Sequence, residues 1–396
     1  MSRVQEGVCL ELHSTCEASP SNCVAQPGTN SDRNKVLDAL RGIAILLVLG
    51  RHTLTSELWN KVGWSGVDLF FVLSGFLISG LLFQEFKRFG NIRLRSFWVR
   101  RGFKIYPAFY LCTAVQTVVF ALRFGKTPGV PPPLHLFLID ASFLSSYFMG
   151  LAAHTWSLAI EEHFYFLLPL FLLALIKLHP KKRDPFTPIP NVFLIIAIGS
   201  LALRIAARPT SQVDYYHYLF PTHLRMDGLF CGVMLGYLYH FKSQFLTRLA
   251  RWPLLVAGCM LLAPMYYMNI EYWHMYTWGL TCTYLGFACV MIWAIHVPYR
   301  QKHLLTFPVE ALARIGFYSY SIYLWHWLVV FYLRPYVRSR CVTIGSPFAW
   351  SSTLETWQWP ASVVLCIVLG IGMAIIVEQP FLRLRDRWFP SRTRAI

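Results

Sequence analysis

Charged residues are scarce in this sequence, and their scarcity excludes an ordinary soluble fold. Only 14% of the 396 residues are charged and 56% are hydrophobic, whereas about a quarter of the residues in a soluble domain are charged. The apolar residues fall in blocks of about twenty, the length that an α-helix needs to cross a hydrocarbon layer of ~30 Å. We therefore predict an all-α, polytopic membrane protein.

Two further features are missing. The ten cysteines form no CxxC pair, and Cys9, Cys16 and Cys23 are too widely spaced for the usual metal-ligand pattern, so we expect free thiols and no metal site. Residues 1–34 lack the apolar stretch that follows a charged start in a signal peptide, so we expect them to form a disordered cytoplasmic tail.

The apolar blocks predict about ten transmembrane helices in one membrane domain over residues 35–387, followed by a short cytoplasmic tail, 388–396. The segment 134–150 is apolar but short and contains Asp140, so a re-entrant helix and a further span both remain open. The expected spans lie at 36–53, 66–84, 103–122, 156–176, 190–207, 227–241, 252–269, 277–297, 315–333 and 359–378.

The formal net charge is +17, but its distribution argues against a nucleic-acid partner. Most Lys and Arg residues lie in short loops on alternate sides of the apolar blocks, which is how membrane topology is encoded. This bias predicts a multi-pass protein of the cytoplasmic (inner) membrane, with the lipid bilayer as a partner and both termini in the cytoplasm. It assigns Arg204 and Arg225 to the opposite side.

The first span contains ionisable side chains, each of which costs roughly 2.5 to 3.5 kcal/mol to insert. Arg41 and His52 are eleven residues apart, so on a helix they lie some 20° off a common face and about 16.5 Å apart along the axis. This geometry suits a passage that takes a long anionic donor from the inner face. The alternative is that Arg41 anchors the helix by snorkelling and His52 is an interfacial residue.

Two other groups of residues have a structural and a functional interpretation. Asp68 begins the second span, where it either stabilises the helix N-terminus or orients a nearby histidine. Arg101 and Lys104 lie on one turn at a membrane entrance, where they either bind phosphate groups or only signal topology.

The fourth span begins with Trp156, Ser157, Glu161 and Glu162. We predict that Glu161 assists a catalytic histidine and that Trp156, Ser157 and Glu162 contact the acceptor substrate; an interfacial belt is the alternative. His326, between two tryptophans, is more often a packed histidine than a base, and we assign it to substrate binding.

Four strings together resemble the membrane acyltransferase 3 family, whose members O-acylate surface polysaccharides, lipopolysaccharide and other glycosides. They are LDALRGIA from Leu37 with His52, GVDLFFVLSGFLI from Gly66, RRGFKIYP from Arg100 and WSLAIEEHFYFLLPL from Trp156. Weaker matches include RMDGL from Arg225 and YSIYLWHW from Tyr320. The family's Arg-x-x-Arg pair is here Arg101 and Lys104, which keeps both charges but loses one bidentate fork.

The resemblance implies that Arg41 and His52 are essential and that the chain transfers an acyl group, most simply acetyl, to a carbohydrate hydroxyl. Acyl-CoA (acetyl-CoA) is the expected donor, bound by Arg41, Arg101 and Lys104; no cofactor is expected to be permanently bound. His52 is the expected general base, helped by Glu161 or Asp68. Intramembrane Arg, His and Glu also line transport routes, so a glycolipid transporter or flippase is the alternative.

Overall fold

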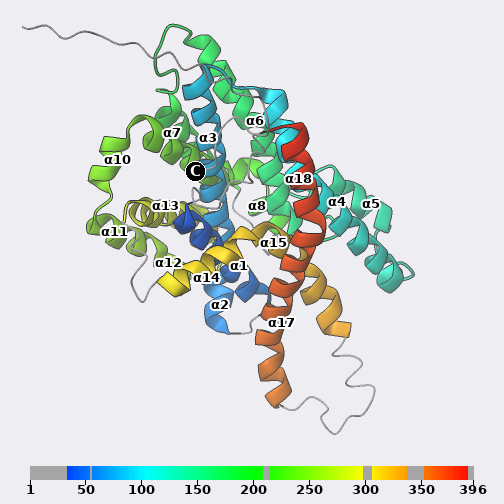
Figure 1. Cartoon of the computed structure of the whole chain (residues 1–396). Coiled ribbons are helices and arrows are strands. Elements are labelled where there is room, and N and C mark those ends of the chain that lie inside the picture. The colour runs from blue at the N-terminus through cyan, green and yellow to red at the C-terminus, as the bar shows by residue number, and fades with distance from the viewer. Residues whose placement is uncertain (1–33, 54–55, 208–213, 298–305, 337–351, 391–396) are drawn as a thin grey trace, which may run out of the picture.

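The computed structural model describes residues 34–53, 56–207, 214–297, 306–336 and 352–390. Within these ranges the chain forms helices joined by turns and contains no strand, which confirms the all-α prediction (Figure 1). The expected tail 1–34 lies outside the described residues except for Asn34, and the end of the C-terminal tail, 391–396, also lies outside them.

The helices range in length from four to 31 residues. In chain order they are α1 (Lys35–Thr53), α2 (Glu57–Val62), α3 (Gly66–Phe89), α4 (Leu94–Phe124), α5 (Pro133–Ala141), α6 (Thr155–Leu178), α7 (Ile189–Ala206), α8 (Tyr215–Tyr218), α9 (Met226–Phe241), α10 (Ser243–Leu249), α11 (Trp252–Leu262), α12 (Pro264–Tyr267), α13 (Leu280–His296), α14 (Thr306–Phe317), α15 (Ser319–Trp327), α17 (Ser352–Met373) and α18 (Gln379–Trp388). Three π-helical segments, η4 (Met275–Gly279), η5 (Leu328–Leu333) and η6 (Ala374–Glu378), interrupt the α-helical runs.

Six helical segments among the described residues are long and apolar enough to cross a membrane, and a seventh is possible if the bent pair at 243–267 counts as one span. The chain is therefore a multi-pass membrane protein, but the predicted number of ten spans is not confirmed. Each expected span coincides with helical structure. Three of them do not meet this test. Helix α1 contains Asp38, Arg41 and Arg51, α9 has only 16 residues, and the segment formed by α15 and η5 is not among the six.

The ambiguous stretch 134–150 is not a full span. Helix α5 has nine residues, which is about 13 Å at ~1.5 Å per residue, less than half of a hydrocarbon core. Asp140 organises the loop that follows, because its carboxylate accepts hydrogen bonds from the Leu151 amide (2.8 Å) and the Thr155 hydroxyl (2.7 Å). This loop leads directly into α6.

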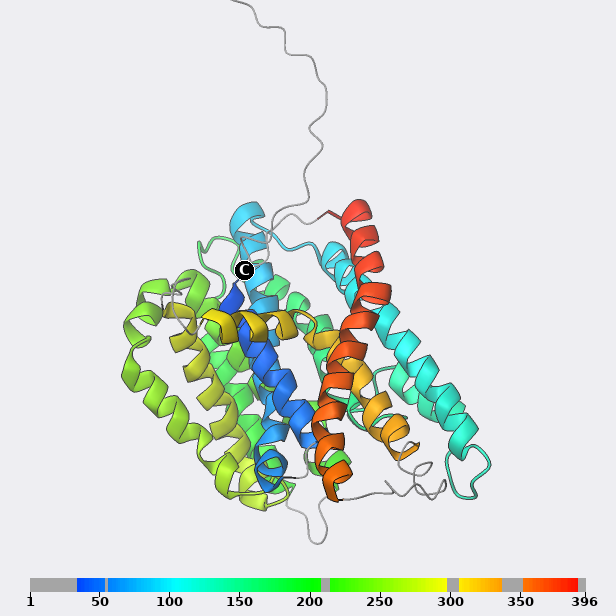
Figure 2. The same ribbon diagram turned by 60° about the horizontal axis from the view of Figure 1, so that its bottom comes forward.

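Helices α1, α3 and α9 form the centre of the bundle (Figure 2). Helix α9 presents Gly228, Gly232 and Gly236 at four-residue intervals, and Gly75 of α3 lies against Gly232. Small residues at this spacing let two helix backbones come into direct contact. A Cβ atom on Gly232 would overlap the Val72 carbonyl oxygen and lie 2.8 Å from the Gly75 Cα.

Helix α14 lies across the beginning of α1 and is likewise in backbone contact with it (Figure 2). A Cβ atom on Gly42 would overlap the Leu312 carbonyl, and one on Gly316 would overlap the Asp38 carbonyl. The end of α1 that carries Arg41 is therefore held between α3 and α14.

We predict that Gly232→Ala lowers the free energy of unfolding by about 1–3 kcal/mol, because overpacking forces two backbones apart. Gly199→Ala is the matched control, since nothing lies within 4 Å of a Cβ atom there and alanine is the better helix former. Thermal unfolding of both variants in detergent checks this. Equal midpoints would mean that the α3–α9 contact is looser than described.

Candidate functional site

Helix α1 presents Arg41 and His52 to two different cavities. The first, the Arg41 cavity, has a volume of about 230 Å³ and is lined by Arg41, Arg101, Lys104, Glu161 and Glu162. The three predicted cations thus come together from α1 and α4, opposite two carboxylates of α6. An aqueous cavity explains why these charged groups lie in the interior of a membrane protein.

The carboxylates of the Arg41 cavity have hydroxyl partners. Glu161 accepts hydrogen bonds from Ser74 and from Tyr165, both at 2.8 Å, and Glu162 accepts one from Tyr106 at 3.2 Å. The Arg101 guanidinium lies 4.9 Å from the centre of the Tyr165 ring. Among the hydrogen bonds between described residues, none joins Glu161 to His52, the pairing that the sequence suggested.

The second cavity, the His52 cavity, has a volume of about 350 Å³ and is richly aromatic. Its walls include His52, His154, Trp156 and Arg225, with Trp64, Tyr215, Tyr216, Phe220 and Trp327 among the aromatic residues. Trp156 lines this cavity as part of a flat aromatic surface, because its ring stacks on the ring of Phe220 with 4.4 Å between the ring centroids.

Val67 and Tyr323 line both cavities and so separate them. The Tyr323 hydroxyl donates to the His154 carbonyl oxygen (2.8 Å) and is bonded to the Ser157 hydroxyl (2.6 Å). Ser157, a predicted acceptor-contacting residue, lines the Arg41 cavity instead of the His52 cavity. The wall between the cavities is thin, because single side chains reach both of them.

His52 is hydrogen-bonded to His326. The distance from His52 Nδ1 to His326 Nε2 is 3.0 Å, and His326 Nδ1 in turn contacts the Tyr323 carbonyl oxygen. His326 is fully buried and lines neither cavity. Its predicted contact with substrate therefore has no surface on which to form.

Asp68 has a partner other than histidine. Its carboxylate accepts a hydrogen bond from Arg225 at 2.8 Å, and both side chains are buried. The Arg225 guanidinium also lies 5.5 Å from the centre of the Trp156 ring. Asp68 therefore orients a cation, Arg225, on the wall of the His52 cavity. The sequence had suggested either that Asp68 stabilises the helix N-terminus or that it orients a histidine.

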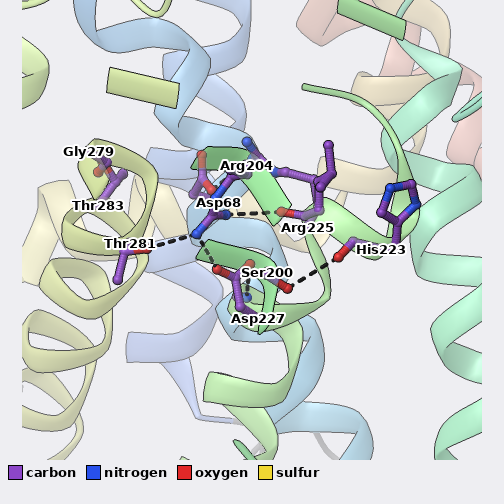
Figure 3. Close-up of polar contacts among 11 residues, drawn as sticks. Asp68, Ser200, Arg204, His223, Arg225, Asp227, Gly279, Thr281 and Thr283 are labelled. Atoms are coloured by element: carbon purple, nitrogen blue, oxygen red, sulfur yellow. Dashed lines mark hydrogen bonds and ion pairs between the residues drawn. The ribbon is translucent and has the colours of Figure 1, made fainter. Parts of the chain in front are cut away.

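A second buried ion pair lies beside this one (Figure 3). Arg204 donates to Asp227 at 2.8 Å, and their side chains are 1% and 2% exposed. The same guanidinium donates to the Leu224 carbonyl (3.0 Å) and the Thr281 hydroxyl (2.8 Å). Arg204 and Arg225, which the charge distribution placed on the opposite side of the membrane, are thus buried inside the bundle. Among the described residues, no three His, Cys, Asp or Glu side chains cluster as metal ligands do.

Sequence reasoning missed His154, Tyr323 and Arg225. Arg225 and Tyr323 belong to the RMDGL and YSIYLWHW strings, which matched the family weakly but did not indicate what either residue does. His154 stands next to Thr155 in a loop, and no pattern in the sequence distinguishes it.

A family model described as an acyltransferase domain matches residues 34–378. The chain is 29% identical to the peptidoglycan O-acetyltransferase OatA of Listeria monocytogenes over 81% of its own length and 52% of the relative's. It is 30% identical to a putative O-acetyltransferase of Staphylococcus aureus (76% and 51% covered) and 27% identical to the putative peptidoglycan O-acetyltransferase YrhL of Bacillus subtilis (91% and 56%). The chain thus spans about half the length of these relatives. No solved structure matches it.

We predict that Asp227→Asn lowers the free energy of unfolding by about 3–5 kcal/mol, because it leaves the Arg204 guanidinium buried without a counter-charge. Glu57→Gln removes one partner of the solvent-exposed pair with Lys61 and should leave stability unchanged. Chemical denaturation in detergent measures both. A similar effect of the two substitutions would show that Arg204 is solvated.

Proposed function

This chain belongs to the acyltransferase domain family that matches residues 34–378, and we propose that it is a membrane O-acyltransferase that moves an acetyl group from acetyl-CoA to a hydroxyl of a glycan. Membership of the family and the names of the relatives support acyl transfer. The donor and the acceptor are inferred from the chemistry of the two cavities.

One observation carries this proposal. A single helix presents a guanidinium to one cavity and an imidazole to the next, and Val67 and Tyr323 border both. A two-substrate transfer requires separate sites for donor and acceptor that meet where the group is passed on. The Arg41 and His52 cavities have this relation.

The Arg41 cavity suits an anionic donor. Arg41 and Arg101 supply planar guanidinium groups that bind phosphate through paired hydrogen bonds, and Lys104 adds a point charge. We infer that the cations bind the phosphate groups of acetyl-CoA and that its thioester points toward Tyr323.

The His52 cavity suits a carbohydrate acceptor. Its aromatic side chains offer flat apolar faces, and Arg225 offers hydrogen-bond donors, which is the mixture that a sugar ring can use. Two of the relatives are named for peptidoglycan and none of those compared for lipopolysaccharide. We therefore propose a peptidoglycan-type glycan as the acceptor.

His52 acts as the general base in the proposed reaction. It takes the proton from the acceptor hydroxyl, whose oxygen attacks the thioester carbonyl carbon. A carbon–oxygen bond forms, the carbon–sulfur bond breaks, and the leaving thiolate takes the proton from the imidazolium. The products are the acetyl ester and the free thiol of CoA.

The proposed orientation places the Arg41 cavity toward the cytoplasm, where acetyl-CoA is made. The start of α1, the end of α18 and the basic α3–α4 connection lie at the same end of the bundle (Figure 2), in agreement with the positive-inside rule. Both termini would then be cytoplasmic, in the cytoplasmic membrane, with the His52 cavity opening toward the far side.

We predict that His52→Ala lowers the rate of acetyl transfer by about 10²–10⁴-fold, the usual contribution of a general base. Transfer of label from radioactive acetyl-CoA to solubilised peptidoglycan strands, measured with membranes that contain the full chain, checks this. His179→Ala is the control, because the His179 side chain contacts the Leu175 carbonyl at the end of α6 and lines neither cavity. Undiminished transfer by His52→Ala would rule out the proposed base.

We also predict that Arg41→Gln and Arg101→Gln raise the KM for acetyl-CoA more than tenfold. Loss of a hydrogen bond to a charged group costs about 1.5–3 kcal/mol, which is roughly 10- to 150-fold in affinity. Arg95→Gln removes the same charge from an exposed position of α4 and should leave the KM unchanged. If all three variants behave alike, the Arg41 cavity does not bind the donor.

A further inference from the structure

The buried pair of histidines behind the His52 cavity determines which nitrogen of His52 is available for chemistry. We propose that His326 is a positioning residue that holds His52 in the tautomer with an unprotonated Nε2 facing the cavity. This inference rests on the proposed function for its catalytic consequence, but not for the tautomer itself.

The protons can be assigned from the partners of each ring nitrogen. The Tyr323 carbonyl oxygen only accepts hydrogen bonds, so His326 Nδ1, which contacts it, carries a hydrogen. A neutral imidazole has one N–H, so His326 Nε2 then offers a lone pair. That lone pair lies 3.0 Å from His52 Nδ1, which must be the donor. His52 Nε2 is left without a proton.

The relative orientation of the two rings supports this hydrogen bond. Their planes are inclined by only 14° and their centroids are 5.1 Å apart, whereas the bonded nitrogens are 3.0 Å apart. The rings therefore meet edge to edge and nearly in one plane, which aligns the N–H of one ring with the in-plane lone pair of the other.

The assignment requires His326 to be neutral. A doubly protonated His326 would donate through both nitrogens and force His52 Nδ1 to accept, which would put the proton on the cavity-facing Nε2. His326 is fully buried, and its ring is surrounded by His52, His154, Tyr323 and Trp327. None of these supplies a carboxylate, and burial without one favours the uncharged imidazole.

The consequence for the reaction is a base that is already in the correct protonation state. A histidine whose second nitrogen has no fixed partner divides its population between two tautomers and two ring orientations. A fixed acceptor removes that choice and stabilises the imidazolium formed during the transfer. His326 would do this without touching substrate, as a fully buried side chain can.

A matched pair of variants tests the proposal. In His326→Gln the amide oxygen reaches about as far as Nε2 and can accept from His52 Nδ1, whereas His326→Met has the same length and no comparable acceptor. We expect His326→Gln to keep kcat within about fivefold and His326→Met to lose about 10²-fold, within the usual range for acid–base catalysis. The KM for acetyl-CoA should be unchanged in both, because His326 does not line the Arg41 cavity.

Two comparisons separate positioning from general damage. In a His52→Ala background, His326→Met should have no further effect, because residues that act as a unit are not additive. Equal losses in the Gln and Met variants with intact thermal unfolding, or an additive loss in the double variant, would overturn the proposal.

A direct measurement keeps the tautomer independent of the enzymatic proposal. Nitrogen-15 NMR of histidine-labelled protein, assigned with His52→Asn, should show a protonated Nδ1 and an unprotonated Nε2 for His52 in the wild type and in His326→Gln. In His326→Met the nitrogen signals of His52 should report a mixture of its two tautomers. If the wild type transfers no acetyl group but shows this tautomer, only the proposed function fails. A protonated Nε2 in the wild type overturns the inference about His326.

Discussion

An ionisable side chain inside this bundle must either have a partner or face a cavity, because lipid and packed apolar side chains do not solvate charge. This constraint divides the interior groups into two sets. The pairs Arg204–Asp227 and Arg225–Asp68 each form an ion pair with an N–O distance of 2.8 Å. Arg41, Arg101 and Lys104 line a cavity. Arg225 belongs to both sets, since it is paired with Asp68 and also faces the His52 cavity. A structural network is thus continuous with the wall of the candidate site.

Backbone contact between helices makes this arrangement possible. Gly75 and Gly232 bring α3 and α9 together, and Gly42 and Gly316 do the same for α1 and α14. Because α3 also carries Asp68 at its start, its close approach to α9 brings that carboxylate to Arg225, which immediately precedes α9. Larger residues at the contacts would separate the helices and, with them, the buried ion pairs. The glycines therefore stabilise the site indirectly, through the distance between the elements that carry it.

The wall between the cavities links this architecture to the proposed chemistry. Tyr323 borders both cavities through its side chain, and its backbone carbonyl holds His326, which holds His52. The same turn of α15 therefore lies between the two cavities and, in the proposed mechanism, would separate the two substrates and orient the base. The chain covers about half the length of its relatives. Residues of its described part line both cavities.

Composition and block length were sufficient to predict a helical membrane protein, because crossing a hydrocarbon layer requires about twenty apolar residues in a row. Helical spacing placed Arg41 and His52 on one face of α1, since that spacing is a local property of the chain. The number of spans was less predictable: α1 carries charges that a purely apolar criterion rejects. The partners of the buried groups were not predictable at all. Asp68 meets Arg225 across 157 positions of sequence and His52 meets His326 across 274, and only helix packing determines which side chains from such distant segments come within hydrogen-bonding distance.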